Sequence, residues 1–225
     1  MNNIGILMNP ECRKLFEKIN NRPFCKECQE KRAAFKEKEQ KKGHYSNLLP
    51  GFSSLKINIP LDILIIGEAH GGRENLFREQ KSLDSEVIEF NYFYRYEKLV
   101  TFHQKQMREL FDYLDNVNKT WVFTDLIKCF VWRKKRENEK IAISFCRRYL
   151  NEQIDFFKPR LILAIGIKVC KEYFGIKIDK LKHGKKYEIS GKKIISCIFP
   201  SRNTADIWIE NGGWEKIKEA LNNSF

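Results

Sequence analysis

Two carboxylates stand at or near the ends of apolar segments, where they could stabilise a developing positive charge. Glu68 follows the run DILIIG (62–67), and Asp125 lies in the run WVFTDLI (121–127). A carboxylate can favour a cationic transition state and orient a water molecule for attack on it. Each also has a structural alternative, because Glu68 could begin a helix and Asp125 could cap a turn or pair with Lys128. Residue type and spacing alone leave both interpretations open.

Four of the seven cysteines have a spacing that suits a metal site. Cys25 and Cys28 form a C-x2-C pair, in which two thiolates of one turn can face a common metal. Cys129 and Cys146 have sixteen residues between them and lie in a basic segment. Four thiolates suffice for a 4Fe–4S cluster, and four-cysteine sites also bind zinc. The spacing alone therefore favours neither metal.

The remaining cysteines are expected to be core residues rather than halves of disulfides. Cys170 and Cys197 lie on apolar segments, and Cys12 could replace a metal ligand. The chain contains no apolar run long enough to span a membrane, and its N-terminus lacks the pattern of a signal peptide. We therefore expect a cytoplasmic protein that does not bind membranes, a location where disulfides are rare.

The segments that must position these residues alternate between strand and helix character. Strand-like apolar runs occupy 62–67, 121–127, 161–166 and 193–199. Helical periodicity is found at 97–115, 144–157 and 212–223. Because the strands are apolar on both faces, they predict a parallel sheet covered by helices. The expected fold is α/β, a three-layer α/β/α sandwich around a central four-stranded parallel sheet, with its site at the carboxyl ends of the strands.

Length and charge limit the domain organisation and suggest a class of partner. With 225 residues, of which 42% are hydrophobic, the chain predicts one domain with a sizeable core. Its 42 basic residues exceed the 29 acidic ones and give a net charge of +13. Such a surface suits a polyanion, because neutralising phosphates releases condensed counterions, although a lysine-rich solvated surface has the same composition. The charged segment WRKKRENEK (132–140) is predicted to be a loop.

Taken together, the segments at the strand ends resemble the iron–sulfur families four and five of the uracil-DNA glycosylase superfamily. ILIIGEAHGG and VFTDLIKC are similar to motifs of the fourth family, as is the block CRRYLNEQIDFFKPRLILAIG. HGKKYEISGKKIISCIFPSRNT and the upstream CKECQEKRAAF are closer to the fifth family. The resemblance covers residues 25–222 with the motifs in consistent order.

The resemblance implies a monofunctional DNA glycosylase that releases a damaged or modified base and leaves an abasic site. The base would be flipped out of double- or single-stranded DNA, because its glycosidic bond is inaccessible inside the stack. Glu68 corresponds to the catalytic glutamate of the fourth family. The four cysteines correspond to the ligands of a structural 4Fe–4S cluster, with zinc as the alternative. The cluster would tie segment 10–50 to a single domain of residues 1–225, which we expect to be monomeric.

The same resemblance assigns a set of residues to base or DNA binding. They lie in the loops after the strands and in the FPSRNT segment: Gly67, Ala69, His70, Gly71, Phe77, Gly166, His183, Phe199, Pro200, Ser201, Arg202 and Asn203. For some of them a structural role is an equal alternative. His70 could only pack its own loop, and Arg202 beside Ser201 could be a solvated surface pair.

Three departures from the family pattern bear on the substrate. The histidine of the second motif is replaced by Phe199, and the base-reading asparagine by Asp125. The Pro-Phe element that supplies the stacking aromatic is absent, so Phe77 or an aromatic of 90–94 would have to serve. An ionised Asp125 offers acceptors only, which suits the amino group of cytosine better than O4 of uracil.

These departures leave the substrate, the activity and the biological role open. The expected substrate is uracil or, from Asp125, a modified cytosine. The role would be DNA repair or defence against phage DNA that carries modified bases. The alternative is a catalytically silent nucleic-acid-binding relative of the same fold.

Overall fold

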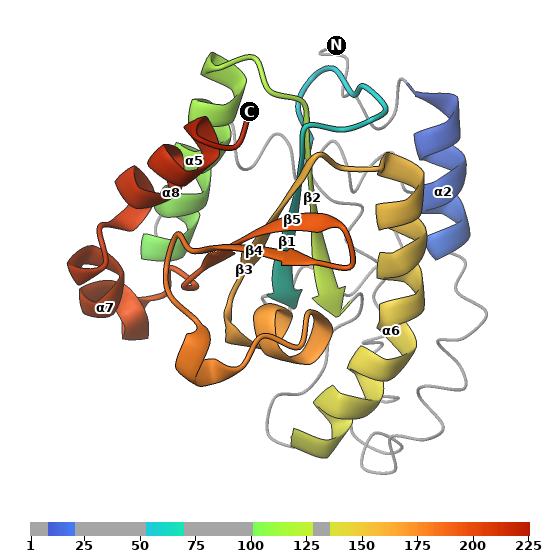
Figure 1. Ribbon diagram of the computed structural model, residues 1–225. Coiled ribbons are helices and arrows are strands. Elements are labelled where there is room, and N and C mark those ends of the chain that lie inside the picture. Colours follow the sequence, from blue (N-terminus) through green and yellow to red (C-terminus); the bar gives the residue numbers. More distant parts are fainter. Residues whose placement is uncertain (1–8, 21–52, 70–100, 128–135) are drawn as a thin grey trace.

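A central sheet with helices on both faces forms the framework of the protein (Figure 1). The structure is a computed structural model, and it describes residues 9–20, 53–69, 101–127 and 136–225. The strands lie in the order β2-β1-β3-β5-β4. Their bounds are Ile63–Ala69 (β1), Trp121–Ile127 (β2), Leu161–Ile165 (β3), Lys186–Ile189 (β4) and Lys192–Cys197 (β5).

The four predicted strands and their parallel pairing are confirmed. β1 pairs with β2 and β3, and β3 pairs with β5, all in parallel. The prediction of four strands missed β4, which pairs antiparallel with β5 at the edge of the sheet. Ser190 and Gly191 form the two-residue turn between them, both with positive φ, of 50° and 71°. Because β4 is only half-buried and carries charged residues, it lacks the apolar signature of an interior strand.

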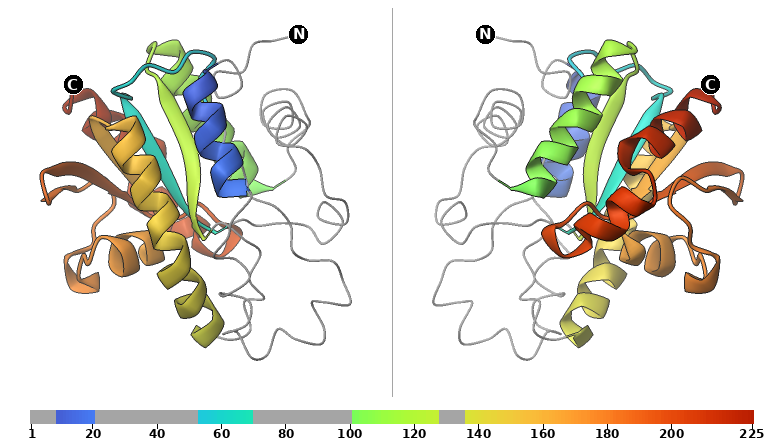
Figure 2. Two further views of the ribbon diagram at one scale, coloured as in Figure 1. Left: turned by 90° about the vertical axis from the view of Figure 1, so that its right-hand side faces the viewer. Right: turned by 90° about the vertical axis from the view of Figure 1, so that its left-hand side faces the viewer.

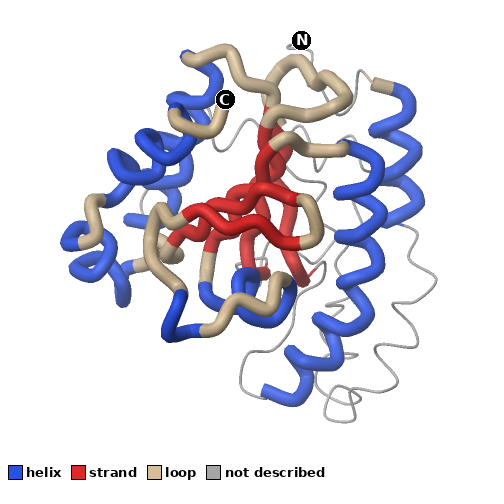
Figure 3. Tube along the Cα trace, viewed as in Figure 1, coloured by secondary structure: helices blue, strands red, loops and turns tan. Residues whose placement is uncertain are grey.

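Two groups of helices cover the two faces of the sheet (Figure 2, Figure 3). One face packs against α2 (Pro10–Asn20), α6 (Arg136–Phe157) and the π-helix η4 (Val169–Tyr173). The other packs against α5 (Phe102–Asn116), α7 (Ala205–Glu210) and α8 (Gly213–Asn222). Two short 3-10 helices complete the fold, η5 (Ile178–Lys180) and η6 (Arg202–Thr204). The predicted three-layer α/β/α sandwich is therefore confirmed.

Alternation along β1 divides its side chains between the two layers. Leu64 and Ile66 are buried on the α6 face, whereas Ile63 and Ile65 are buried on the α5 face. The α6 face is held by a directional contact as well as by apolar burial. Thr124 on β2 donates to Gln153 of α6 at 3.1 Å, and both side chains are completely buried. The prediction of a parallel sheet, made from strands that are apolar on both faces, is therefore correct.

The helices begin at residues that differ in part from those predicted. α6 begins at Arg136, so the prediction of a loop over 132–140 is wrong for residues 136–140. The sequence RENEK is rich in good helix formers, so its charges alone do not indicate a loop. α2 begins directly after Asn9, whose side chain accepts the backbone N–H groups of Glu11 and Cys12. No helix in the described ranges is long and apolar enough to cross a membrane.

Candidate active site

Glu68 lies near the end of β1 and is held there by the loop that follows β3. By the alternation of the strand it faces the same side as Ile66, toward α6 and η4. Its Oε1 atom accepts a hydrogen bond from the backbone N–H of Lys168 at 3.1 Å. The side chain passes over Gly166, where an added Cβ would lie 2.4 Å from Oε1 and 2.5 Å from Cγ. Gly166 also has φ of +102°, which glycine adopts without strain.

Asp125 lies on the neighbouring strand β2, one position before the level of Glu68. It pairs in register with Gly67 of β1 and is only 3% exposed. A Cβ added to Gly67 would lie 2.4 Å from Oδ1 of Asp125 and 2.9 Å from the ring of Phe123. The Asp125 carboxyl group therefore lies against the main chain of β1, in space that only a glycine leaves empty.

The two carboxylates reach the carboxyl edge of the sheet from opposite faces. Asp125 alternates with Thr124 and so faces the α5 layer, with Trp121 and Phe123. Glu68 faces the α6 layer. Because β1 and β2 are neighbours, the ends of both strands meet at one edge, as expected for parallel strands. The structure thus brings both predicted catalytic residues to the same edge, one in each layer.

The segment from Phe199 to Asn203 lies at this edge, after β5. Pro200 is buried, whereas Arg202 and Asn203 are exposed at the start of η6. The Ser201 hydroxyl lies 2.9 Å from Oγ1 of Thr204, and Thr204 in turn donates to the Phe199 carbonyl at 2.5 Å. The hydroxyl of Ser201 is therefore hydrogen-bonded within its own loop. Arg202 and Asn203 are the residues of this segment that are exposed to solvent.

His183 is buried in the protein interior rather than placed at the surface. Its Nδ1 accepts the backbone N–H of Ile198 at 3.1 Å. Nε2 lies 2.8 Å from the Gly213 carbonyl, so this nitrogen carries the proton and donates. Burial lowers the pKa of the ring, which is only 3% exposed and meets the edge of Trp208. Both nitrogens serve the backbone, so this geometry does not fit the predicted contact with DNA.

His103, in the first turn of α5, was not singled out from the sequence. Its ring stacks on that of Phe199, with centroids 4.5 Å apart and planes 23° from parallel. Burial lowers its pKa to about 4, and a hydrogen bond to the Pro200 backbone opposes this shift only in part. Proline has no N–H, so the ring is the donor. Its Nδ1 is buried and has no hydrogen-bond partner in the described ranges. The signal for this contact is tertiary, and no local pattern indicates it.

The described cysteines separate into core thiols and one predicted ligand. Burial raises the pKa of the Cys12 and Cys170 thiols to about 12 and that of Cys197 well above its ordinary value. Cys146 is 5% exposed on α6. The other predicted ligands, Cys25, Cys28 and Cys129, lie outside the described residues, as do His70, Gly71 and Phe77. Ala69 is the last residue of β1.

No metal site emerges from the described ranges alone, where no group of three or more histidine, cysteine and acidic side chains could hold an ion. Because three of the four predicted ligands lie outside those ranges, the four-cysteine site stays a prediction.

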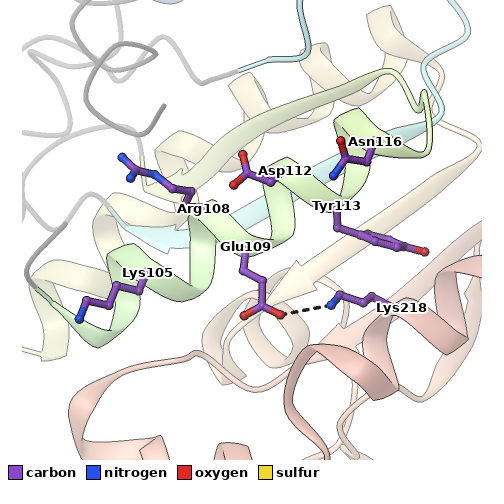
Figure 4. Close-up of a pocket in the computed structure, with 7 residues that line it drawn as sticks. All are labelled: Lys105, Arg108, Glu109, Asp112, Tyr113, Asn116 and Lys218. Carbon is purple, nitrogen blue, oxygen red and sulfur yellow. Dashed lines mark hydrogen bonds and ion pairs between the residues drawn. The ribbon is translucent and has the colours of Figure 1, made fainter. Parts of the chain in front are cut away.

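An open groove runs along the outer side of α5 and α8 (Figure 4). Basic, acidic and polar side chains line it: Lys105, Arg108, Glu109, Asp112, Tyr113, Asn116 and Lys218. The ammonium of Lys218 bridges the helices by pairing with Glu109 at 3.2 Å. Neither Glu68 nor Asp125 is among the lining residues, so this groove is separate from the carboxyl edge.

A family model described as the uracil DNA glycosylase superfamily matches residues 56–209 of the chain. The matched region contains both carboxylates, Gly166 and the segment from Phe199 to Asn203. No curated protein matches the chain.

Replacing His103 by glutamine tests its buried, uncharged state. In the unfolded chain the ring takes up a proton near pH 6.5, but in the folded protein only near pH 4. The folded state binds fewer protons in this interval, so the free energy of unfolding falls as the pH drops from about 6.5 to 4. We expect His103→Gln to remove up to about 3 kcal/mol of this fall. Urea denaturation at several pH values would measure it. Equal slopes for the wild type and the variant would contradict the burial of an uncharged ring.

Proposed function

The chain belongs to the uracil-DNA glycosylase superfamily, and from this premise we propose that it is a monofunctional DNA glycosylase. It hydrolyses the N-glycosidic bond of a base flipped out of DNA and leaves an abasic site. In this reaction the bond between C1′ and the base breaks with its electrons going to the base. Water then forms the new bond to C1′ and loses a proton. The sugar carries positive charge in the transition state, so the site needs a fixed negative charge beside it.

The observation that carries the proposal is the way in which Glu68 is held. One carboxylate oxygen is fixed by the Lys168 N–H, and the side chain lies in the space above Gly166. Within the described part of the chain no protein donor occupies the other oxygen, Oε2. A carboxylate fixed through one oxygen can use the other to stabilise the cationic sugar and orient the attacking water. Such preorganisation supports catalysis because no reorientation is needed during the reaction.

DNA as the partner is supported by charge and by the exposed side chains at the same edge. The net charge of +13 favours a polyanion. Arg202 and Asn203 project from η6, where they can contact the backbone or fill the space that the flipped base leaves. Flipping is required because the target bond is inaccessible in stacked DNA.

Asp125 supports a base that carries an amino group where uracil has O4. Its carboxyl group is buried beside Gly67, so a base reaching it meets an acceptor when Asp125 is ionised. A carboxylate that accepts from N4 of cytosine is a complementary pairing. We therefore infer a modified cytosine as the preferred base, with uracil as the alternative. Excision of ordinary cytosine would damage the DNA of the host.

We also infer that Cys25, Cys28, Cys129 and Cys146 hold a 4Fe–4S cluster. The chemistry of the donor set fits, because four thiolates are the usual ligands of such a cluster. The nearly buried Cys146 would supply its thiolate from α6. Hydrolysis requires no electron transfer, so the cluster would be structural and would tie the N-terminal segment to the domain. Zinc is the competing occupant.

One observation favours a second candidate function, a DNA-binding relative without catalytic activity. Phe199 stands where the resemblance implies a histidine, and its ring is occupied by stacking on His103. A silent relative would keep the fold and the basic surface without releasing a base. Assays of base release separate the two candidates.

Glu68→Gln tests the catalytic proposal. The change keeps the shape of the side chain and removes its charge, so DNA binding should persist while base release falls by at least about 100-fold. Oligonucleotides that each carry one altered base, cleaved with alkali after incubation, would measure release. Glu172→Gln is the matched control, because it removes a charge from the nearby η4. Full activity of Glu68→Gln would disprove the role of Glu68, and absence of release by the wild type from every base would favour the silent binder.

Asp125→Asn tests the inferred base preference. An amide offers both a donor and an acceptor, so the variant should release uracil faster relative to cytosine derivatives than the wild type does. The measurement is the ratio of the two release rates under single-turnover conditions. The inference fails if both proteins release uracil equally and neither acts on any cytosine derivative.

Elemental analysis of purified protein tests the cluster. We expect iron and broad absorbance in the visible range, and Cys146→Ser should lower the iron content strongly. Cys12→Ala, a change at another buried cysteine, should leave iron in place. Stoichiometric zinc without iron would show that the protein binds zinc and would disprove the cluster.

A further inference from the structure

The side chain of Lys168 is not part of the hydrophobic core and takes no part in the hydrogen bond to Glu68. Its backbone N–H binds Glu68, whereas its ammonium extends to Glu139 in the first turn of α6, at 2.9 Å. The Lys168 side chain is 39% exposed and that of Glu139 is 13% exposed. The lysine side chain is therefore more exposed than the glutamate side chain with which it pairs.

We propose that the ammonium of Lys168 binds a DNA phosphodiester next to the nucleotide whose sugar lies beside Glu68. This assignment rests on the proposed function, and it adds a phosphate-binding group on the α6 side of the site. The phosphates of a nucleotide are joined directly to its sugar. A sugar beside Glu68 therefore carries a phosphate close to that glutamate. Lys168, whose N–H contacts Glu68, can reach this phosphate with its side chain.

Electrostatics at this edge favour a cation in the position of Lys168. Glu68 and Asp125 both carry negative charge when ionised, and each repels an approaching phosphate. Arg202 is exposed on the segment after β5, and no ion pair joins it to Glu68 or Asp125 among the described residues. Lys168 supplies a positive charge from the residue whose N–H contacts Glu68.

The ion pair with Glu139 orients the ammonium and leaves it able to bind a phosphate. An ammonium has three donors, and the single contact to Glu139 leaves two of them for a phosphate. A half-exposed ion pair contributes only about 0–1 kcal/mol, so a phosphate can compete with or join it. Because the ion pair already restricts the lysine side chain, the entropic cost of ordering it on binding is smaller. Glu139 is thus a positioning residue for Lys168.

The side chain and the main chain of Lys168 can be tested separately. Every residue except proline has a backbone N–H, so Lys168→Met removes the ammonium and keeps the donor to Glu68. Lys171 provides a matched control, because it is 41% exposed in the same segment and pairs with Glu172 at 3.5 Å. Lys168→Arg restores a cation and should restore binding.

The experiment is the salt dependence of binding to an undamaged duplex, measured by fluorescence anisotropy. For Lys168→Met we expect weaker binding and a slope of log Kobs against log salt that is shallower by about 0.9. Lys171→Met, by contrast, should keep the slope of the wild type. Thermal unfolding should show that all variants remain folded.

Two results would overturn the proposal: a wild-type slope for Lys168→Met, or equal losses for Lys168→Met and Lys171→Met. Because undamaged DNA is the probe, the result does not depend on base release. If the proteins bind with the predicted slopes but the wild type releases no base, the proposed glycosylase activity is disproved. The phosphate site is then still supported.

Discussion

The candidate site depends on one steric constraint that is used twice: each carboxylate lies over a glycine of the neighbouring strand or of the loop that follows it. Asp125 of β2 lies against Gly67 of β1, and Glu68 of β1 lies against Gly166 after β3. Adjacent parallel strands are about 4.8 Å apart, so a side chain can lean across its neighbour only where that neighbour has no Cβ. The two glycines allow two charged groups to lie close to main chain at the end of a buried sheet.

This arrangement also separates the tasks of the two acids. Glu68 faces the α6 layer and receives a backbone donor from the loop after β3, whereas Asp125 faces the α5 layer and is almost completely buried. Two like charges on one face would repel each other strongly, and the sheet between them reduces this repulsion by distance. The same edge can therefore offer one acid to the sugar and another to the base.

The sequence predicted the framework well because the signals for it are local. Apolar runs such as LILAIG require burial on both faces, and their order along the chain was enough to indicate a parallel sheet. It predicted Glu68 and Asp125 at the edge because strand ends can be read from those runs. The edge strand β4 was missed because its charged residues resemble a loop. The partners of His103 and His183 were missed because they come from segments distant in the sequence.

His183 couples the position of α8 to the β4–β5 hairpin. Its ring joins a turn before β4 to the end of β5 and to the first residue of α8, so three segments meet at one imidazole. Because Nδ1 accepts from the end of β5 and Nε2 donates to the start of α8, the direction of the ring is fixed from both sides. The position of α8 is therefore tied to the β4–β5 hairpin through one uncharged imidazole, and a change in the hairpin would be felt at the start of that helix.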